Sequence, residues 1–455
     1  MGKLFGTDGI RGVANKELTC ELAFRAGQAL AIVLAGESKH QAKIYIGKDT
    51  RISSDMLECA LAAGISSVGA EVGLLGYVPT PAVAYLTLKH GADAGVVISA
   101  SHNPMEFNGI KAFNSKGFKL SDELEERVEE IILSDKPIEV MTGEGIGKIA
   151  SLPDAAREYA EYVKNTVIGD LSGMKILVDC ANGASYNTAK MIFEGLSADF
   201  NVIFDEPNGT NINNGCGSTH LDKLRSRVAA GKYDVGIAFD GDADRCLVVD
   251  ENGDVVDGDK IMAICARSLV KRGKLPHNTF VATVLSNLGL HAYAKENGLS
   301  VECSNVGDRN VLELMEKNGY VLGGEQSGHI IFREYATTGD GELTAVQFLS
   351  IIKELGVSVS SAAAEITQYP QIMINVKVEN DVKEAVLGDW AVKEVIRDVE
   401  EALGEDGRIL VRPSGTEPLV RVMVEGKAFD EVSALAGRAA DKISQISKEK
   451  KASKK

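Results

Sequence analysis

No stretch of the sequence approaches the run of ~18 apolar residues that a membrane-spanning helix needs, so we expect no membrane partner. Cysteine is also scarce: the 455 residues include seven, and no two of them form a Cys-x-x-Cys pair. A dispersed, odd number of cysteines fits reduced thiols better than a disulfide framework. The beginning of the chain has no signal-peptide pattern. We therefore expect a cytoplasmic protein.

Positive charge is in deficit, with 49 lysines and arginines against 65 aspartates and glutamates and a net charge of −16. Such a protein repels the phosphate backbone, so no nucleic-acid partner is expected. Phosphorylated metabolites stay compatible with this charge because they need only a local basic pocket. The one basic run, residues 448–455, is predicted to be a solvated, frayed tail. The sequence does not fix the oligomeric state and leaves a homodimer open.

The length predicts several domains, because 455 residues exceed one ordinary core. Strand-like and helix-like patterns alternate along the first third of the chain, beginning with a helix that Thr19 caps, and the alternation restarts near residues 175 and 259. Alternation of this kind predicts sheets covered by helices. A fourth block differs, with a helix predicted over 382–403 between strands. The glycine-rich stretch 139–153 is predicted to be a linker.

The expected fold is therefore α/β, with three similar α/β domains built on mixed sheets and a smaller C-terminal α+β domain around a central cleft. Each block places a polar, glycine-flanked loop after an apolar strand, where ligands bind in open α/β sheets. The predicted boundaries are 1–153 for the first domain, 154–254 for the second, 255–367 for the third, 368–447 for the fourth and 448–455 for the basic tail.

The first polar loop, residues 98–104, carries Ser101 between a strand and Pro104. A serine in this place is a candidate nucleophile or phosphate carrier. The alternative is a turn or capping serine, the commoner role of an isolated serine. No Gly-x-Ser-x-Gly elbow surrounds it, which argues against a serine hydrolase.

The second polar loop carries Asp240, Asp242 and Asp244. Three carboxylates within five residues repel one another unless a cation lies among them, and hard oxygen ligands suit Mg²⁺ or Ca²⁺. An EF-hand is the rival interpretation, but Arg245 stands where its sharp turn requires glycine, and the flanking segments are strand-like. The loop therefore predicts a site for Mg²⁺, which completes its coordination with water and substrate phosphate.

Three further loops complete the candidate site. Residues 323–329 combine glycines with hydrogen-bonding side chains, which suits sugar hydroxyls, although a polar surface turn would have the same composition. Residues 412–421 combine arginines, hydroxyls and glycine, as a phosphate-binding loop does, with a charged surface turn as the alternative. Residues 6–12 place Arg11 beside glycines that allow close approach to a phosphate.

Taken together and in this order, the loops resemble those of the α-D-phosphohexomutase superfamily over nearly the whole chain. Three features resemble the members that act on glucosamine phosphates: residues 6–9, Gln326 where relatives that act on mannose and glucose phosphates carry methionine, and residues 306–309. The resemblance implies a TBP-like last domain and interconversion of glucosamine 6-phosphate and glucosamine 1-phosphate, which feeds the synthesis of UDP-N-acetylglucosamine and cell-wall precursors.

The resemblance also implies residue roles. Ser101 is expected to be the phosphoserine, and its oxygen joins Asp240, Asp242 and Asp244 as ligands of Mg²⁺. Glucosamine or glucose 1,6-bisphosphate is expected as the intermediate and activator. The other catalytic residues are expected to be Lys111, His329, Arg11 and Arg245. The expected substrate-binding residues are Glu325, Gln326 and Ser327 for the sugar, and Arg412, Ser414, Gly415, Thr416 and Arg421 for the distal phosphate.

Two alternatives stay open. The first is a phosphomannomutase/phosphoglucomutase with the same machinery and a different sugar. The second is a catalytically silent sugar-phosphate sensor, against which the intact Ser101, aspartates and Lys111 argue. Proton transfer falls to Lys111 or His329, and the sequence does not distinguish them.

Overall fold

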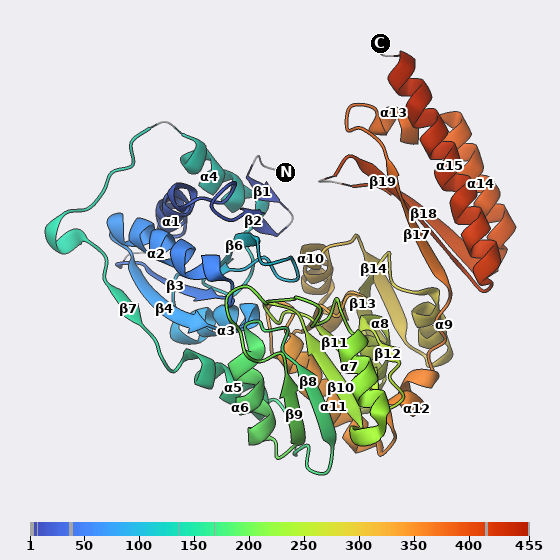
Figure 1. Ribbon diagram of the computed structural model, residues 1–455, viewed down its shortest axis with the longest axis horizontal. Coiled ribbons are helices and arrows are strands. Elements are labelled where there is room, and N and C mark those ends of the chain that lie inside the picture. The colour runs from blue at the N-terminus through green and yellow to red at the C-terminus, as the bar shows by residue number, and fades with distance from the viewer. Residues whose placement is uncertain are drawn as a thin grey trace. The chain divides into compact units, whose positions relative to one another are not determined.

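The structure is a computed structural model that describes residues 4–6, 8–35, 40–134, 136–167, 169–414 and 417–453. The chain forms two compact units, which are described separately (Figure 1). The first comprises Met1–Leu285 and Asn297–Glu365, and the second comprises Ser286–Glu296 and Ile366–Lys455. Among the helices that the structure describes, none has both the length and the apolar character of a membrane span.

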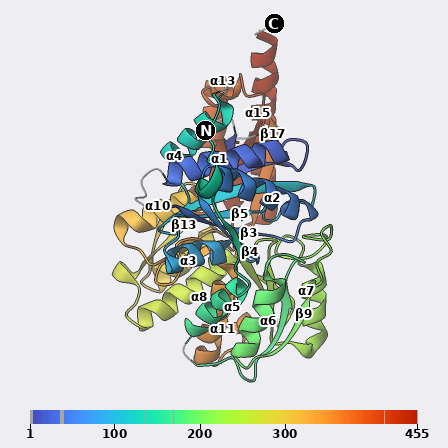
Figure 2. The same cartoon turned by 90° about the vertical axis from the view of Figure 1, so that its left-hand side faces the viewer.

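The first α/β domain is built on a mixed seven-stranded sheet with the order β1-β2-β6-β5-β3-β4-β7. Helices α1, α2 and α4 pack on the face that carries Ile44 and Ile46, whereas α3 covers the other face, where Gly47 and Gly95 leave room for Val83 (Figure 2). The elements are β1 (Phe5–Gly6), β2 (Gly9–Val13), α1 (Cys20–Ala35), β3 (Lys43–Lys48), α2 (Ile52–Ser67), β4 (Glu71–Tyr77), α3 (Thr80–His90), β5 (Ala94–Ile98), β6 (Phe107–Asn114), α4 (Asp122–Leu133) and β7 (Ile149–Ser151).

The second domain has a five-stranded sheet with the order β12-β11-β10-β8-β9, and the third has a four-stranded sheet with the order β14-β13-β15-β16. Both sheets mix parallel and antiparallel pairs. The elements of the second are α5 (Ala155–Asn165), β8 (Lys175–Asp179), α6 (Ser185–Gly195), β9 (Asp199–Ile203), α7 (Asp222–Arg227), β10 (Val235–Phe239), β11 (Cys246–Asp250) and β12 (Val255–Val256). Those of the third are α8 (Gly258–Lys271), β13 (Thr279–Thr283), β14 (Ser300–Ser304), α10 (Asp308–Asn318), β15 (Leu322–Gly324), β16 (Ile330–Phe332), α11 (Gly341–Leu355) and α12 (Val359–Ala364).

The second unit has an antiparallel three-stranded sheet with the order β17-β19-β18, whose apolar face packs on helices. Helix α9 belongs to this unit, and the backbone amide of Leu288 at its start donates a hydrogen bond to Glu425 on β19 at 2.9 Å. The elements are α9 (Leu288–Glu296), β17 (Gln371–Lys377), α13 (Lys383–Leu387), α14 (Trp390–Leu403), β18 (Gly407–Pro413), β19 (Leu419–Gly426) and α15 (Phe429–Ser453).

The expected fold class is confirmed, with three α/β domains on mixed sheets and a C-terminal α+β domain. Three local expectations were wrong. The helix predicted over 382–403 is two helices, because Asp389 caps a new helix by accepting a hydrogen bond from the Ala391 amide at 3.0 Å. Part of the linker 139–153 is strand β7, which extends the first sheet beside β4. The basic tail is helical as far as Ser453, because α15 continues through it.

Candidate functional site

The loop after β5 holds Ser101 in an unusual conformation. Its φ of 51° lies in the left-handed region, which a residue with a Cβ rarely adopts without support. The support begins with hydrogen bonds: the Ser101 amide donates to the Ser99 hydroxyl at 2.9 Å, and that hydroxyl donates to Asp49 at 2.6 Å. Ser101 is 1% exposed, so its hydroxyl has a fixed, enclosed position.

A buried arginine, Arg51, binds the same loop from the segment that follows β3. The Arg51 guanidinium donates to the carbonyl oxygens of Ser101 and Asn103, both at 2.8 Å, and to that of Pro104. Its Nε also donates to Asp49 at 2.8 Å. From the second domain, Asn213 donates to the Ser101 carbonyl at 2.8 Å. The sequence analysis missed these residues, although a polar Asp-Thr-Arg segment directly after a buried strand was a usable signal.

The three aspartates after β10 form a compact acidic cluster. Asp240, Asp242 and Asp244 are at most 5% exposed, and one carboxylate oxygen from each lies within 4.8 Å of the others. The Ser101 hydroxyl donates to Asp240 Oδ2 at 2.6 Å, so the predicted nucleophile meets the cluster. Within the described residues, Asp242 Oδ1 and Asp244 Oδ1 have no hydrogen-bond partner. Buried, unpartnered carboxylate oxygens fit the ligand set of a hard divalent cation.

The pKa values of the cluster follow from burial and neighbouring charge. Burial raises the pKa of Asp240 and of Asp244, and repulsion from the other carboxylates adds to the effect. Burial also acts to raise the pKa of Asp242, but the Lys111 ammonium at 2.9 Å and the Thr80 hydroxyl at 2.7 Å outweigh it and lower that pKa. Two of the three carboxylates are therefore unfavourable as anions until a cation binds.

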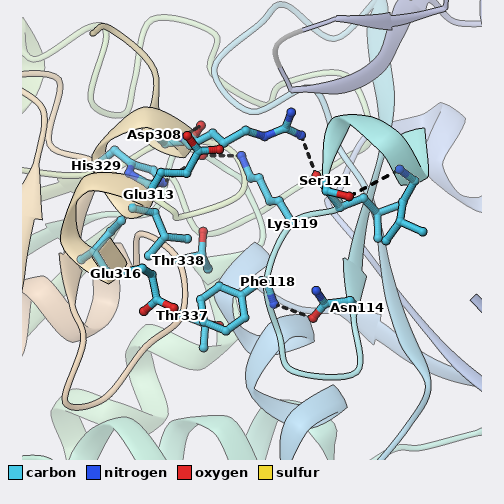
Figure 3. Close-up of a pocket in the computed structure, with 15 residues that line it drawn as sticks. Asn114, Phe118, Lys119, Ser121, Asp308, Glu313, Glu316, His329, Thr337 and Thr338 are labelled. Carbon is cyan, nitrogen blue, oxygen red and sulfur yellow. Dashed lines mark hydrogen bonds and ion pairs between the residues drawn. The ribbon is translucent and has the colours of Figure 1, made fainter. Parts of the chain in front are cut away.

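Lys111 begins a series of ion pairs that runs from the acidic cluster to His329. Its ammonium lies 2.9 Å from Asp242 and 3.0 Å from Asp8. Asp8 lies 2.6 Å from the ammonium of Lys119. Lys119 also pairs with Asp308, whose carboxylate lies 3.6 Å from His329 Nε2 (Figure 3). Burial acts to lower the pKa of Lys111, but the surrounding carboxylates outweigh it and raise that pKa, so Lys111 is protonated at neutral pH.

His329 closes this series beside a cavity of about 350 Å³. Figure 3 shows Lys119, Asp308 and His329 facing this cavity. The cavity lies between the segment that follows β6 and the start of α10. The histidine is 3% exposed, and within the described residues neither ring nitrogen has a hydrogen-bond partner. The ring nitrogens can therefore still form a hydrogen bond with a bound molecule. The role of Lys119 was not predicted from the sequence.

Three further basic side chains belong to the site, those of His102, Arg245 and Arg11. His102 Nδ1 is 3.1 Å from the Ser101 hydroxyl. Burial, together with the positive charges of Arg245 and Arg11, lowers the pKa of His102 to about 4. The amide of Arg245 donates to Asp240 at 3.2 Å, and Arg11 pairs with Asp8. Arg11, Arg245 and Lys111 thus make a positive surrounding for a phosphoryl group at Ser101.

The predicted sugar loop connects β15 to β16. The Gly307 amide donates to Glu325 at 3.0 Å, which joins the loop to the start of α10. The Gln326 side chain donates to Asp257 at 3.1 Å, and Asp257 is the N-cap of α8. Gln326 therefore binds another residue of the protein, and the Ser327 hydroxyl donates to Glu325 at 3.5 Å.

The predicted distal phosphate residues belong to the second unit. Arg412 on β18 is the register partner of Arg421 on β19. Ser414 follows β18, and its hydroxyl accepts a hydrogen bond from the Glu417 amide at 3.2 Å. Lys383, which the sequence analysis did not select, donates to the Ser414 carbonyl at 2.8 Å. Gly415 and Thr416 lie outside the described residues, as does Thr7 of the opening loop.

Comparison with known families agrees with this geometry. Four models of the phosphoglucomutase/phosphomannomutase family match the chain in order. The alpha/beta/alpha domains I, II and III match residues 2–139, 157–253 and 257–369, and the C-terminal domain matches residues 373–442. The fold and the site therefore define a phosphohexomutase, which confirms the resemblance.

Curated relatives indicate which kind of phosphohexomutase the chain resembles. A phosphoglucosamine mutase from Acetivibrio thermocellus is 57% identical over 95% of this chain and 96% of its own length. Another from Ruminiclostridium cellulolyticum is 56% identical over 95% of this chain and 97% of its own length. The chain belongs to the phosphoglucosamine mutase family.

Solved structures show the same fold at low identity. A phosphoglucomutase/phosphomannomutase family protein from Burkholderia thailandensis has a TM-score of 0.78 and 23% identity, over 96% of this chain and 97% of its own. An Aspergillus fumigatus N-acetylphosphoglucosamine mutase, solved with GlcNAc-6P and magnesium, has a TM-score of 0.70 and 18% identity, over 98% of this chain and 96% of its own.

Proposed function

We propose that this protein interconverts glucosamine 6-phosphate and glucosamine 1-phosphate through a phosphorylated Ser101 and a 1,6-bisphosphate intermediate. The observation that carries the proposal is the 2.6 Å hydrogen bond from the Ser101 hydroxyl to Asp240, which places a buried serine against a cluster of carboxylates. The names of the curated relatives support glucosamine as the sugar. The sensor alternative has no use for a nucleophile held in this way.

The proposed cofactor is Mg²⁺, held by Asp240, Asp242, Asp244 and an oxygen of phosphorylated Ser101. When bound, it supplies charge neutralisation for phosphoryl transfer, a reaction that depends on positioning and electrostatics. The unpartnered oxygens of Asp242 and Asp244 support this assignment. The fungal relative with 18% identity was solved with magnesium, which agrees with the proposal.

In the proposed reaction the bond between Ser101 Oγ and phosphorus breaks, and a bond forms from phosphorus to the free sugar hydroxyl. The hydroxyl proton passes to a base, and a proton joins the departing Ser101 oxygen. After the bisphosphate turns over, its other phosphoryl group is transferred to the Ser101 hydroxyl by the reverse proton movements, which leave a free hydroxyl on the sugar. We assign the base to His329, because its ring nitrogens make no hydrogen bond within the described residues, whereas Lys111 is held protonated by carboxylates. Lys111, Arg11 and Arg245 would orient and neutralise the transferred group.

The substrate contacts are proposed from the loops. Glu325, Ser327 and Gln326 belong to the sugar loop, and Arg412, Ser414, Gly415, Thr416 and Arg421 would bind the distal phosphate in either orientation of the bisphosphate. We propose that the domains meet near residues 153, 254 and 367. We also propose the cytoplasm as the compartment, because none of the seven cysteines forms a disulfide.

The test combines specificity with the state of Ser101. Specificity constants are measured for the 6-phosphates of glucosamine, glucose and mannose with Mg²⁺ and the matching 1,6-bisphosphate, and the glucosamine value should be highest. Intact-mass spectrometry should find one phosphoryl group after incubation with the bisphosphate. Ser101→Ala should lose both turnover and the added mass, whereas the exposed control Ser226→Ala should keep both. A higher constant for mannose or glucose phosphates would transfer the assignment to that alternative.

A further inference from the structure

The segment 337–342 joins the third α/β domain of the first unit, to which it belongs, to the first and second domains. Thr337 donates to the Gly117 carbonyl in the first domain. The Tyr159 hydroxyl, from α5, donates to Asp340 at 2.8 Å, and Thr188, from α6, donates to Glu342 at 2.8 Å. Asp340 also caps α11 by accepting from the Leu343 amide at 2.9 Å. The segment is thus fixed at several points.

One glycine of this segment lies directly against the imidazole of His329. A Cβ added to Gly339 would fall 2.3 Å from Nε2, 2.4 Å from Cδ2 and 2.5 Å from Cε1 of that ring. Carbon atoms in van der Waals contact are about 3.5–4.0 Å apart, so the ring would have to move. The ring occupies the space that the missing side chain of Gly339 leaves.

A second glycine, two residues later, lies against the backbone of the metal loop. A Cβ on Gly341 would fall 2.4 Å from the carbonyl oxygen of Arg245 and 2.9 Å from that of Ala243. The Gly341 amide donates to the same Ala243 carbonyl at 3.0 Å. Since Ala243 and Arg245 alternate with Asp242 and Asp244, the position of Gly341 fixes how closely this loop and the segment approach.

We propose that the segment 337–342 is a positioning element that sets the imidazole of His329 and the aspartates of the metal loop relative to each other, through Gly339 on one side and Gly341 on the other. The inference rests on the proposed function, because it assumes that His329 and the aspartates serve the reaction. Neither glycine has a side chain that could take part in the chemistry. Their action is to keep two loops at contact distance while Tyr159 and Thr188 hold the segment in place.

The two glycines predict separable effects. Gly339→Ala displaces a side chain, so the fold and the affinity for Mg²⁺ should stay within about twofold of wild type, whereas kcat should fall about 100-fold with little change in KM. Gly341→Ala displaces backbone next to the aspartates, so the affinity for Mg²⁺ should fall about 10- to 100-fold. The matched control is Gly437→Ala, because a Cβ at that glycine meets no atom within 4 Å.

The experiment measures Mg²⁺ binding to the unphosphorylated full chain by calorimetry, together with kcat, KM and the thermal midpoint of each variant. A Gly339→Ala protein with the kcat of Gly437→Ala would overturn the inference, as would a Gly341→Ala protein with wild-type affinity for Mg²⁺. If Gly341→Ala does not fold, Tyr159→Phe replaces it, and unchanged Mg²⁺ affinity in that variant would count against the inference. An inactive wild type would instead contradict the proposed function, while Mg²⁺ binding still tests the Gly341 contact.

Discussion

The Arg51 guanidinium donates a hydrogen bond to the carbonyl oxygen of Ser101 at 2.8 Å, although 50 residues of chain separate them. Both residues are 1% exposed, and the same arginine binds Asp49 and two further carbonyls of the loop. The left-handed backbone of Ser101 is therefore stabilised by a buried cation that binds its carbonyl oxygen.

The first prediction concerns Arg51→Lys. Lysine keeps the charge but has no planar group to serve Asp49 and the carbonyls together, so buried acceptors lose their partners. We expect at least about 2 kcal/mol of destabilisation and a kcat reduced tenfold or more, with Ser101 phosphorylation slowed. The control is Arg157→Lys, whose side chain is 70% exposed. Equal thermal midpoints and turnover in both variants would show that the loop does not depend on Arg51.

The second prediction distinguishes two aspartates of the metal loop. Asp242→Asn replaces one of the two carboxylates, those of Asp242 and Asp8, that lie within 3.0 Å of the buried Lys111 ammonium, so the metal-free thermal midpoint should fall. Asp244, whose pKa is raised by burial and repulsion, is costly as an anion, so Asp244→Asn should keep or raise that midpoint. Both variants should lose Mg²⁺-dependent turnover. Normal turnover in either one would contradict the assignment of the metal ligands.

The third prediction uses pH. Burial raises the pKa of Asp340 from 3.8 to about 6, so its ionisation destabilises the folded state as pH rises through this interval. Asparagine stays neutral and still accepts the hydrogen bonds of Tyr159 and Leu343 on its oxygen. The stability gained by Asp340→Asn should therefore be absent near pH 3.8, grow up to about pH 6 and level off at up to about 3 kcal/mol. Unfolding midpoints of both proteins across this range provide the measurement, and a constant difference would refute the raised pKa.

The fourth prediction concerns Lys119. Lys119→Met leaves Asp8 and Asp308 as neighbouring carboxylates without their shared cation, which should cost about 3 kcal/mol, as for other buried pairs that lose one partner. The double variant with Asp308→Asn should recover part of this loss, and Lys116→Met on the exposed surface should be neutral. Additive losses in the double variant would mean that the Lys119–Asp308 pair carries no coupling energy.

Local pattern predicted the elements that carry the site. The alternation restarts with strand β8 at Lys175, as predicted, and the Thr19 hydroxyl accepts from the Leu22 amide at 3.2 Å as the predicted cap of α1. The helix break at Asp389 was missed because the apolar spacing continues through it, and a local capping bond decided the outcome.

The contacts that assemble the site were outside the reach of local pattern. Lys119 and Asp308 are 189 residues apart, and Asn213 and Ser101 are 112 apart. Polar residues at strand ends could be identified, but their pairing depends on how the domains pack. The bond from Gln326 to Asp257 shows the same limit, because residue type alone did not indicate it.

The last prediction therefore concerns how Gln326 would influence the choice of sugar. Its side-chain amide donates to Asp257 at 3.1 Å, and its backbone carbonyl oxygen accepts from the Gly258 amide at 3.0 Å. These two hydrogen bonds hold the sugar loop against the start of α8. Methionine has a similar length but only a weak sulfur acceptor, so Gln326→Met removes the side-chain bond to a carboxylate. A bond of this kind is worth about 0.5–1.5 kcal/mol, and more with a charged partner.

The measurement is the ratio of specificity constants for glucosamine 6-phosphate and glucose 6-phosphate. In Gln326→Met this ratio should fall by about 3- to 30-fold, toward glucose. Asp257→Ala removes the same bond while it leaves the glutamine in place, at the added cost of the α8 cap. If the ratio falls in both variants, Gln326 acts by holding the loop. If the ratio falls only in Gln326→Met, the glutamine contacts the sugar directly. If the ratio is unchanged in both variants, the preference for glucosamine is set elsewhere. Residues 306–309 are then the next to test, because the Gly307 amide binds Glu325 of the same loop.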